Sequence, residues 1–367
     1  MSALVIRAGA TARRLIEQDG LNPEQFVVMA GAAGGPKWLA LAGLDRYFFG
    51  EFFAARKRPL FTVGSSISSW RFAAAAQDDP VAAFDRFEQA YLQQRYSDKP
   101  DAAEISSVCN NLLDTLLPDE HIEQLLKHRY LRPNIIAVRC LGKAAHETPR
   151  QLKAGLAAIA VSNLRSRARL AQHMERTVFR HPDGHAPFLP FRDAFVSHEV
   201  ALTADNLKPA LRASASIPLL MQGEPDIPGA PPGMYRDGGL IDYHMDLDYR
   251  LDDGLVLFPH FSTRIVPGWL DKFLPWRKPH AHHLDRVLMI APSEQLLARL
   301  PNKKIPDRKD FNRYSDLDSL LADWRVATAE CRRMADEWAE IVNSGTLASR
   351  LEAFPENSLA TANARNR

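Results

Sequence analysis

Ser66 stands in a sequence pattern that is typical of a catalytic nucleophile. The short apolar run Leu60–Val63 leads into Gly64-Ser65-Ser66-Ile67-Ser68, so a small residue lies two positions away on either side of the serine. This order predicts a strand that turns sharply into a helix, with the serine exposed on a strained turn where bulky neighbours would clash. The helix N-terminus would add partial positive charge beside the hydroxyl. An ordinary Ser/Gly turn is the alternative interpretation.

A glycine-rich loop at Gly31–Lys37 follows another apolar run and precedes a helical pattern. Free backbone N–H groups in such a loop bind an anion, which is either a phosphate or the oxyanion of an acyl-transfer intermediate. A nucleotide P-loop is excluded, because Pro36 and Trp38 stand where the Walker pattern needs glycine and Ser/Thr. Pro36 also lacks an N–H. The candidate amide donors are therefore Gly34, Gly35 and Lys37, and a glycine-rich connection without a ligand is the alternative.

Asp237 is followed by two glycines, which by itself describes a common turn. Upstream lies Arg212–Pro218, a stretch of small residues closed by a proline. A serine hydroxyl needs a base within hydrogen-bond reach, and an aspartate could accept its proton during attack on an ester carbonyl. With an ordinary pKa of about 4, an aspartate is a poor base. Its surroundings must therefore raise that pKa, or an oxyanion hole must carry much of the catalysis.

These segments together resemble the patatin-like phospholipases. Four pieces occur in the order found in that family: Gly34–Lys37, Gly64–Ser68, Arg212–Pro218 and Asp237–Gly239. The resemblance implies a Ser–Asp dyad in which Ser66 is the nucleophile and Asp237 its partner. It also implies an oxyanion hole formed by the glycine loop at Gly34, Gly35 and Lys37, with supporting positions at Gly64, Ser68, Gly238 and Gly239.

The activity implied by this resemblance is that of a lipid acyl hydrolase of the phospholipase A type, acting through an acyl-enzyme with no metal and no organic cofactor. Three positions depart from the family pattern: Ser68, Trp38 and Ala33 each replace a glycine. After the aspartate motif the chain reads Asp242-Tyr243-His244-Met245, where the family often has asparagine and proline. These departures bear on the substrate and leave both dyad residues in place.

Several alternatives stay open at the level of the sequence. Ser66, Asp237 and His260 follow the order of an α/β-hydrolase triad. The run His280–His283 contains three histidines, but no paired cysteine or acidic cluster of recognisable spacing accompanies it, so no metal is expected. Other functions that fit the pattern are a non-catalytic lipid-binding or scaffold protein, and an acyltransferase or thioesterase that uses the same dyad.

Composition indicates an ordinary cytoplasmic enzyme. The 367 residues carry a formal net charge of +2, which gives no global sign of nucleic-acid binding. Three widely spaced cysteines (Cys109, Cys140 and Cys331) favour a reducing compartment without structural disulfides. No apolar run approaches the roughly 18–20 residues of a membrane span, and the first residues lack the pattern of a secretory signal.

Apolar runs alternate with helical patterns along the chain. Strands are expected at residues 26–30, 59–63, 134–140, 193–199, 255–260 and 286–291. Helices are expected near 37–48, 67–76, 81–94, 119–128, 151–171, 205–213 and within 316–353. The alternation predicts a three-layer α/β/α fold with a largely parallel central sheet, and it places the proposed catalytic loops at carboxyl ends of strands. We expect a catalytic domain at 1–265 and a helical C-terminal extension at 266–367.

Two basic segments have a predicted place on the surface. The arginine-rich stretch 163–186 is interpreted as a solvated helix face, with phospholipid headgroup contact as the minority interpretation. The segment 269–278 interleaves aromatic and basic residues, which suits peripheral contact with a membrane surface. A loop whose tryptophans pack on the core is the alternative. The candidate contact residues are Trp269, Phe273, Trp276, Arg277 and Lys278.

Overall fold

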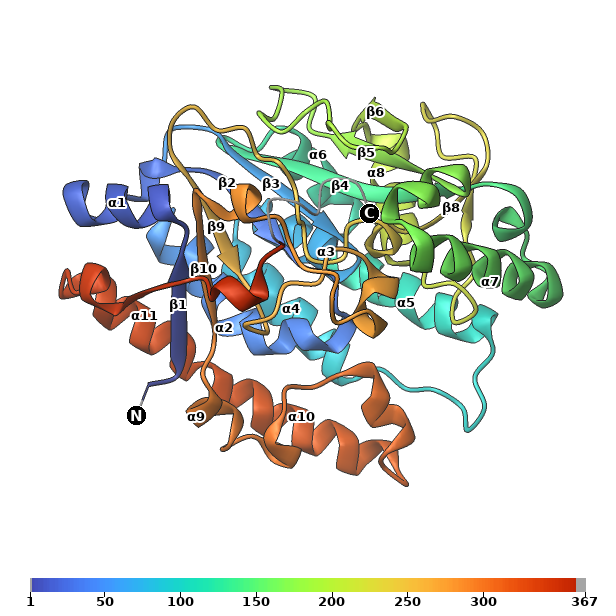
Figure 1. The fold of residues 1–367 in the computed structure, drawn as a ribbon. Helices are drawn as coiled ribbons and strands as arrows, with labels where there is room; N and C mark the ends of the chain where they lie inside the picture. Colours follow the sequence, from blue (N-terminus) through green and yellow to red (C-terminus); the bar gives the residue numbers. More distant parts are fainter. Residues whose placement is uncertain (1, 361–367) are drawn as a thin grey trace.

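The apolar runs of the sequence become strands of one mixed sheet, which forms the centre of the molecule (Figure 1). The computed structural model describes residues 2–360, and within them the sheet has eleven strands. Their spatial order is β11-β1-β10-β9-β2-β3-β4-β5-β6, while β8 pairs with β4 and with β7. The strands are β1 (Leu4–Ala8), β2 (Phe26–Gly31), β3 (Leu60–Ser65), β4 (Leu131–Cys140), β5 (Met174–Arg180), β6 (Ser197–Ala201), β7 (Glu224–Pro225), β8 (Met234–Asp237), β9 (Leu255–Pro259), β10 (Val287–Pro292) and β11 (Leu351–Ala353).

The middle of the sheet is parallel. The neighbouring pairs β10–β9, β9–β2, β2–β3 and β3–β4 all run in the same direction, whereas β1–β10, β4–β5 and β4–β8 are antiparallel. The central strands β9 and β10 are buried along their whole length, as expected for parallel strands covered on both faces. The predicted α/β class with a largely parallel sheet is confirmed.

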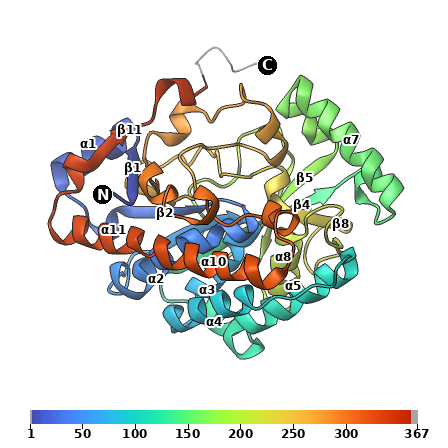
Figure 2. The ribbon, with the colours of Figure 1, turned by 90° about the horizontal axis from the view of Figure 1, so that it is seen from below.

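Helices cover both faces of this sheet. In Figure 2, α7 lies on one side of β4 and β5, while α8 and α5 lie on the other. The helices are α1 (Ala10–Asp19), α2 (Ala42–Tyr47), α3 (Ile67–Ala75), α4 (Pro80–Leu92), α5 (Ala102–Leu116), α6 (Ile122–Leu126), α7 (Pro149–Arg165), α8 (Ala204–Ala215), α9 (Glu294–Leu297), α10 (Leu317–Cys331) and α11 (Arg333–Asn343). This arrangement is consistent with the predicted three-layer α/β/α architecture.

The strands β3 and β8 converge on the same edge of β4. Residues 134–140 of β4 pair on one edge with β5, so the partners of these residues on the other edge are β3 up to Ile136 and β8 from Ala137 onward. Since β3 is parallel to β4 and β8 is antiparallel to it, both strands run toward this junction. Ser65 pairs with Ile136 and Asp237 pairs with Ala137. The topology therefore brings the end of β3 and the end of β8 together.

The segment after residue 265 contributes to the sheet. Strand β10 lies between β1 and β9, so the predicted boundary at 265 falls within the sheet-forming part of the chain. Farther on, α10 packs against a 3₁₀-helix, η2 (Gly35–Leu41), and α11 packs against α2. Figure 2 shows α10 and α11 along one face of the molecule. The last part of the predicted extension, 361–367, lies outside the described residues.

The interpretation of 163–186 as a solvated helix face is wrong. Helix α7 ends at Arg165, and Met174–Arg180 form β5 inside the sheet. The charged residues of β5 interrupt the apolar pattern that predicts a buried strand. They can lie inside the sheet because they have partners of opposite charge in the fold. Arg176, whose side chain is completely buried, donates hydrogen bonds to the carboxylates of Asp193 and Asp242.

Candidate active site

Ser66 lies at the sharp turn between β3 and α3. Its backbone has φ 57° and ψ −134°, a left-handed conformation that is strained for a residue with a side chain. The N–H of Ser66 donates to the Oγ of Ser214 at 2.9 Å, and Ser214 in turn donates to the carbonyl of Ile136 at 2.7 Å. These contacts anchor the turn to α8 and β4. Ser214 belongs to the predicted Arg212–Pro218 block, which thereby acquires a structural role.

Close packing explains the small residues around Ser66. A Cβ at Gly64 would lie 2.6 Å from the Oγ of Ser68 and 3.1 Å from the ring of Phe72. A Cβ at Gly31 would lie 2.6 Å from the Cβ of Ser68. Ser68, which replaces a glycine of the family pattern, fits because its hydroxyl lies 2.8 Å from the carbonyl of Gly31 and accepts the N–H of Ser65 at 3.0 Å. The elbow therefore tolerates this departure without losing its shape.

Asp237 ends β8, and its carboxylate lies close enough to the Ser66 side chain for that side chain to lower its pKa. Its Oδ1 also accepts the N–H of Gly239 at 2.7 Å. Both dyad side chains are buried, with Asp237 only 7% exposed. Burial raises the pKa of Asp237 to about 6, while the hydrogen bonds from Ser66 and Gly239 act in the opposite direction. The carboxylate is thus a better proton acceptor than an exposed aspartate, and it is ionised at neutral pH.

The two glycines after Asp237 allow the chain to pass close to β3 and β4. A Cβ at Gly238 would lie 2.2 Å from the carbonyl oxygen of Ile136 and 2.8 Å from the Cβ of Ser65. A Cβ at Gly239 would lie 2.9 Å from the Oδ1 of Asp237. A side chain at either position would push the carboxylate away from Ser66. The glycines are therefore needed for the approach of the two strand ends.

A buried polar network locks the aspartate loop to the serine turn. The hydroxyl of Ser65 donates to the carbonyl of Asp242 at 2.7 Å. The Asp242 carboxylate accepts hydrogen bonds from Arg176 at 2.6 and 3.0 Å, and both side chains are almost completely buried. Asp242 belongs to the segment in which this chain departs from the family pattern. Here its ion pair with Arg176 fixes the loop. Its partner lies 66 positions upstream, and no sequence pattern links the two residues.

The glycine loop faces the same cavity as Ser66. Gly34 and Gly35 line this cavity, and within residues 2–360 no acceptor is found for either backbone N–H. The N–H of Lys37, by contrast, donates to the carbonyl of Gly34 at 3.4 Å. Of the three predicted amide donors, only Gly34 and Gly35 are therefore free to bind an oxyanion. The Lys37 side chain lines the cavity instead.

The other two departures in this loop make structural contacts, and Ala33 also lines the serine cavity. Trp38 is buried and stacks on Phe87 with ring centroids 4.0 Å apart. Ala33 donates its N–H to the carbonyl of Tyr243 at 2.8 Å. Both residues thus hold the loop in place, one through the core and one through the aspartate segment.

The cavity that contains Ser66 and Asp237 has a volume of about 220 Å³. Part of its wall is apolar and comes from α3, α5 and the segment after α8: Ile67, Trp70, Leu112, Ile217, Leu220 and Met221. Another part comes from beyond residue 265 and carries Trp269, Lys272, Arg308 and Lys309. Lys272, Arg308 and the apolar residues after α8 were missed as site residues, because no local motif marks them.

The histidines do not complete a triad with Ser66 and Asp237. Within the described part of the chain, no histidine lines the serine cavity. His260 is completely buried, pairs through Nδ1 with the Ser262 backbone, and contacts the ring of His244 at 4.4 Å. Burial lowers the pKa of His260 to about 3, which makes it a poor proton acceptor. The geometry therefore favours the dyad over the triad.

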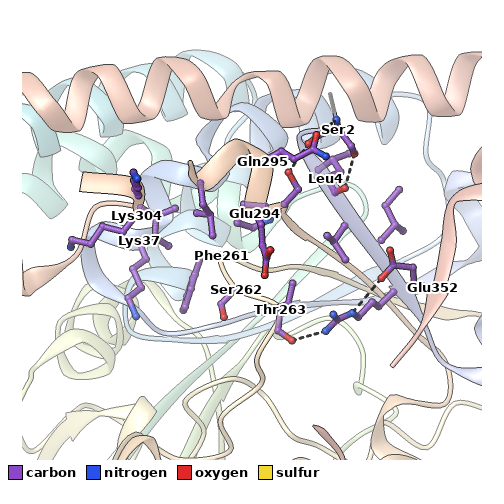
Figure 3. Close-up of a pocket in the computed structure, with 18 of the residues that line it drawn as sticks. Ser2, Leu4, Lys37, Phe261, Ser262, Thr263, Glu294, Gln295, Lys304 and Glu352 are labelled. Atoms are coloured by element: carbon purple, nitrogen blue, oxygen red, sulfur yellow. Dashed lines mark hydrogen bonds and ion pairs between the residues drawn. The ribbon is translucent and has the colours of Figure 1, made fainter. Parts of the chain in front are cut away.

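A neighbouring groove of about 780 Å³ is shown in Figure 3. It shares Lys37 with the serine cavity but contains neither Ser66 nor Asp237. Its wall carries both signs of charge, including Arg7, Glu294, Lys304 and Glu352. In Figure 3 the Lys37 side chain lies beside Phe261 at one end of this groove. The two candidate residues Ser66 and Asp237 both lie in the smaller cavity.

One group among residues 2–360 has the composition of a metal site. Nitrogen or oxygen atoms of Asp246, His280 and His283 all lie within 4.8 Å of one another. The Asp246 carboxylate accepts hydrogen bonds from both imidazoles, at 3.0 and 2.7 Å. These bonds account for the contacts of the buried carboxylate without an ion. The acidic partner of the histidine run is therefore present in the fold although it lies far away in the sequence.

No family model matches this chain, and no curated protein or solved structure is significantly similar to it. The site must therefore be judged on its own geometry. Within residues 2–360, no helix combines the length and the apolar character that a membrane span requires.

Proposed function

We propose that this chain is a serine hydrolase of the patatin-like type, which cleaves ester-linked acyl groups through Ser66 and Asp237. The observation that carries the proposal is that Ser66, on a strained strand-to-helix turn, lines the same cavity as the buried carboxylate of Asp237, whose pKa is raised to about 6. Gly34 and Gly35, for whose N–H groups no acceptor is found within residues 2–360, line the same cavity. An apolar wall beside them suits an acyl chain.

In this mechanism Asp237 takes the hydroxyl proton while the Oγ of Ser66 attacks the ester carbonyl. The amides of Gly34 and Gly35 stabilise the negative charge that develops on the carbonyl oxygen, and removing one such donor typically costs about 10²–10³ in rate. The carboxylic acid of Asp237 then returns the proton to the departing alcohol. Water attacks the acyl-enzyme in the same way, with Asp237 again as the base.

The proposal is tested by hydrolysis of 4-nitrophenyl butyrate. The wild type should release nitrophenolate, and Ser66→Ala should lose this activity. Ser107→Ala makes the same chemical change at an exposed position of α5 and should keep the wild-type rate. Equal rates in the wild type and Ser66→Ala would contradict the proposal.

We also propose that the segment around η8 (Trp269–Phe273) contacts a lipid surface next to the cavity. Phe273 and Trp276 are 75% and 62% exposed, which is unusual for large apolar side chains. Trp269 instead lines the serine cavity, and Arg277 donates to the Asn163 carbonyl at 2.8 Å. Phe273 and Trp276 are therefore the candidates for insertion among lipid headgroups.

A further inference from the structure

Asp246, His280 and His283 form a cluster of metal-ligating side chains outside the serine cavity. One potential ligand atom of each residue lies within 4.8 Å of those of the other two. None of these three described residues lines the cavity that contains Ser66 and Asp237. A role of the cluster is therefore separate from the proposed hydrolysis.

The fold directs two imidazoles toward one carboxylate. His280 precedes the 3₁₀-helix η9 (Ala281–Leu284), and His283 follows three positions later. Because residues three apart are eclipsed in a 3₁₀-helix, the two rings lie on the same side of it, with centroids 4.7 Å apart. The Nδ1 of His280 lies 3.0 Å from the Oδ2 of Asp246, and the Nδ1 of His283 lies 2.7 Å from its Oδ1.

The negative charge of Asp246 is balanced by no lysine or arginine at ion-pair distance among residues 2–360. Its side chain is only 4% exposed, and the two histidines that pair with it are charged only when protonated. A buried carboxylate without a lasting counter-charge is unfavourable. A divalent cation would supply this charge while both imidazoles stay neutral. The backbone N–H of His280 donates to Oδ1 at 3.1 Å and fixes the carboxylate, as outer-shell hydrogen bonds do at metal sites.

The distances in the cluster suit a small transition-metal ion. Zinc lies about 2.0–2.1 Å from an imidazole nitrogen and about 2.0–2.2 Å from a carboxylate oxygen. Two such ligand atoms, at an angle of roughly 90–110° at the metal, are about 2.9–3.4 Å apart. The nitrogen-to-oxygen distances of 3.0 and 2.7 Å are close to this range. Two imidazoles with one carboxylate are a donor set of zinc, whereas calcium and magnesium prefer oxygen ligands.

We propose that Asp246, His280 and His283 bind one divalent transition-metal ion, with zinc as the best match to the donor set. Solvent completes a coordination number of four or five, because the side chain of His280 is 43% exposed. The ion has a structural role. It connects two segments, 241–254 and 274–279, whose described residues form neither helix nor strand. His280 and His283 follow Asp246 by 34 and 37 positions, so the ion closes a long loop and stabilises the fold.

A hydrogen-bonded cluster without a metal is the alternative, and titration of the full chain with Zn²⁺ separates the two. The protein would be stripped with a chelator and then titrated in competition with a chromophoric chelator of known affinity. We expect about one equivalent of Zn²⁺ to bind with a Kd below about 1 µM. Zn²⁺ at about 100 times its Kd should raise the midpoint of thermal unfolding by about 3–5 °C. A wild type that binds no Zn²⁺, or whose midpoint does not rise, would overturn the proposal.

Matched variants locate the ion. Asp246→Asn and His283→Gln each remove one ligand and should lower the Zn²⁺ affinity by at least about 100-fold, since loss of an outer-shell partner alone costs about 10–100-fold. Asp248→Asn and His282→Gln make the same changes at neighbouring residues outside the cluster, and both should keep the wild-type affinity. Wild-type affinity in Asp246→Asn would mean that the histidine run alone holds the ion, which would overturn the site.

Co²⁺ as a second probe distinguishes loss of a ligand from damage to the fold. In a site with four or five ligands Co²⁺ absorbs visible light much more strongly than the hydrated ion does. The wild type and Asp248→Asn should show this absorption, while Asp246→Asn and His283→Gln should lack it and keep the wild-type circular dichroism. If a variant does not fold, the titrations of the wild type still decide the proposal. These measurements do not use Ser66, so their outcome is independent of the proposed hydrolysis.

Discussion

Replacing Asp237 by asparagine should stabilise the fold at neutral pH while it abolishes turnover. The pKa of this carboxylate is raised from 3.8 to about 6 in the folded protein, mainly by burial. Its ionised form therefore costs folding free energy above pH 6, and this cost disappears below about pH 4, where the group is protonated in both states. A shift of this size corresponds to an upper limit of about 3 kcal/mol. Roughly half of it develops between pH 5 and pH 8.

The assay is urea unfolding of the wild type and Asp237→Asn at pH 5 and at pH 8. The stability difference between the two proteins should be larger at pH 8 by about 1.5 kcal/mol. Asparagine can still accept the N–H of Gly239 and donate to Ser66, and any change in these hydrogen bonds affects both pH values equally. Esterase activity should fall by about 10³, as is typical for loss of a general base.

Asp242→Asn is the matched control, because it makes the same substitution five residues away. The Asp242 carboxylate is paired with the buried guanidinium of Arg176, so its removal should destabilise the protein by about 3 kcal/mol. The two variants should thus change stability in opposite directions at pH 8. A stability difference for Asp237→Asn that is the same at both pH values would refute the reasoning that burial raises the pKa of Asp237.

Three other predictions follow from the site. For the wild type, kcat/KM on a neutral ester should fall below about pH 6, because protonated Asp237 cannot act as a base, and an inflection near pH 4 would contradict this. Gly238→Ala should lose activity and lower the unfolding midpoint, because its Cβ would lie 2.2 Å from the Ile136 carbonyl oxygen, and wild-type values of both would show that the close approach is not required. The double variant Phe273→Ser and Trp276→Ser should weaken sedimentation with anionic vesicles severalfold and leave hydrolysis of soluble esters unchanged. Unchanged sedimentation would exclude a membrane contact at these residues.

The parts of the site that depend on local pattern could be predicted from the sequence. The elbow at Ser66 and the turn after Asp237 need small residues at fixed spacing, and such a pattern is visible in a few adjacent letters. That these two segments meet depends on the pairing of β3 and β8 with the same edge of β4. In the sequence, only the resemblance of the motif order to that of a known family indicated that the segments around Ser66 and Asp237 come together.

The remainder of the site depends on contacts between remote segments. Ser214 holds the N–H of Ser66 across 148 positions, and Arg176 holds Asp242 across 66. Neither contact leaves a pattern in the sequence. Strand β5 was missed because its charged residues break the apolar pattern of a buried strand, and only the fold shows the partners that allow their burial. Strand β8 was missed because it is only four residues long. Lys272 looked like part of a surface segment, and only the fold brings it to the cavity.

The central claim is that Ser66 is a nucleophile activated by Asp237, and covalent labelling tests it most directly. The protein would be treated with a fluorophosphonate, and the modified peptide would be identified by mass spectrometry. We expect a single adduct on Ser66 in the wild type, none in Ser66→Ala, and labelling slowed by at least tenfold in Asp237→Asn. An unlabelled wild type, or an adduct on another serine, would contradict the dyad.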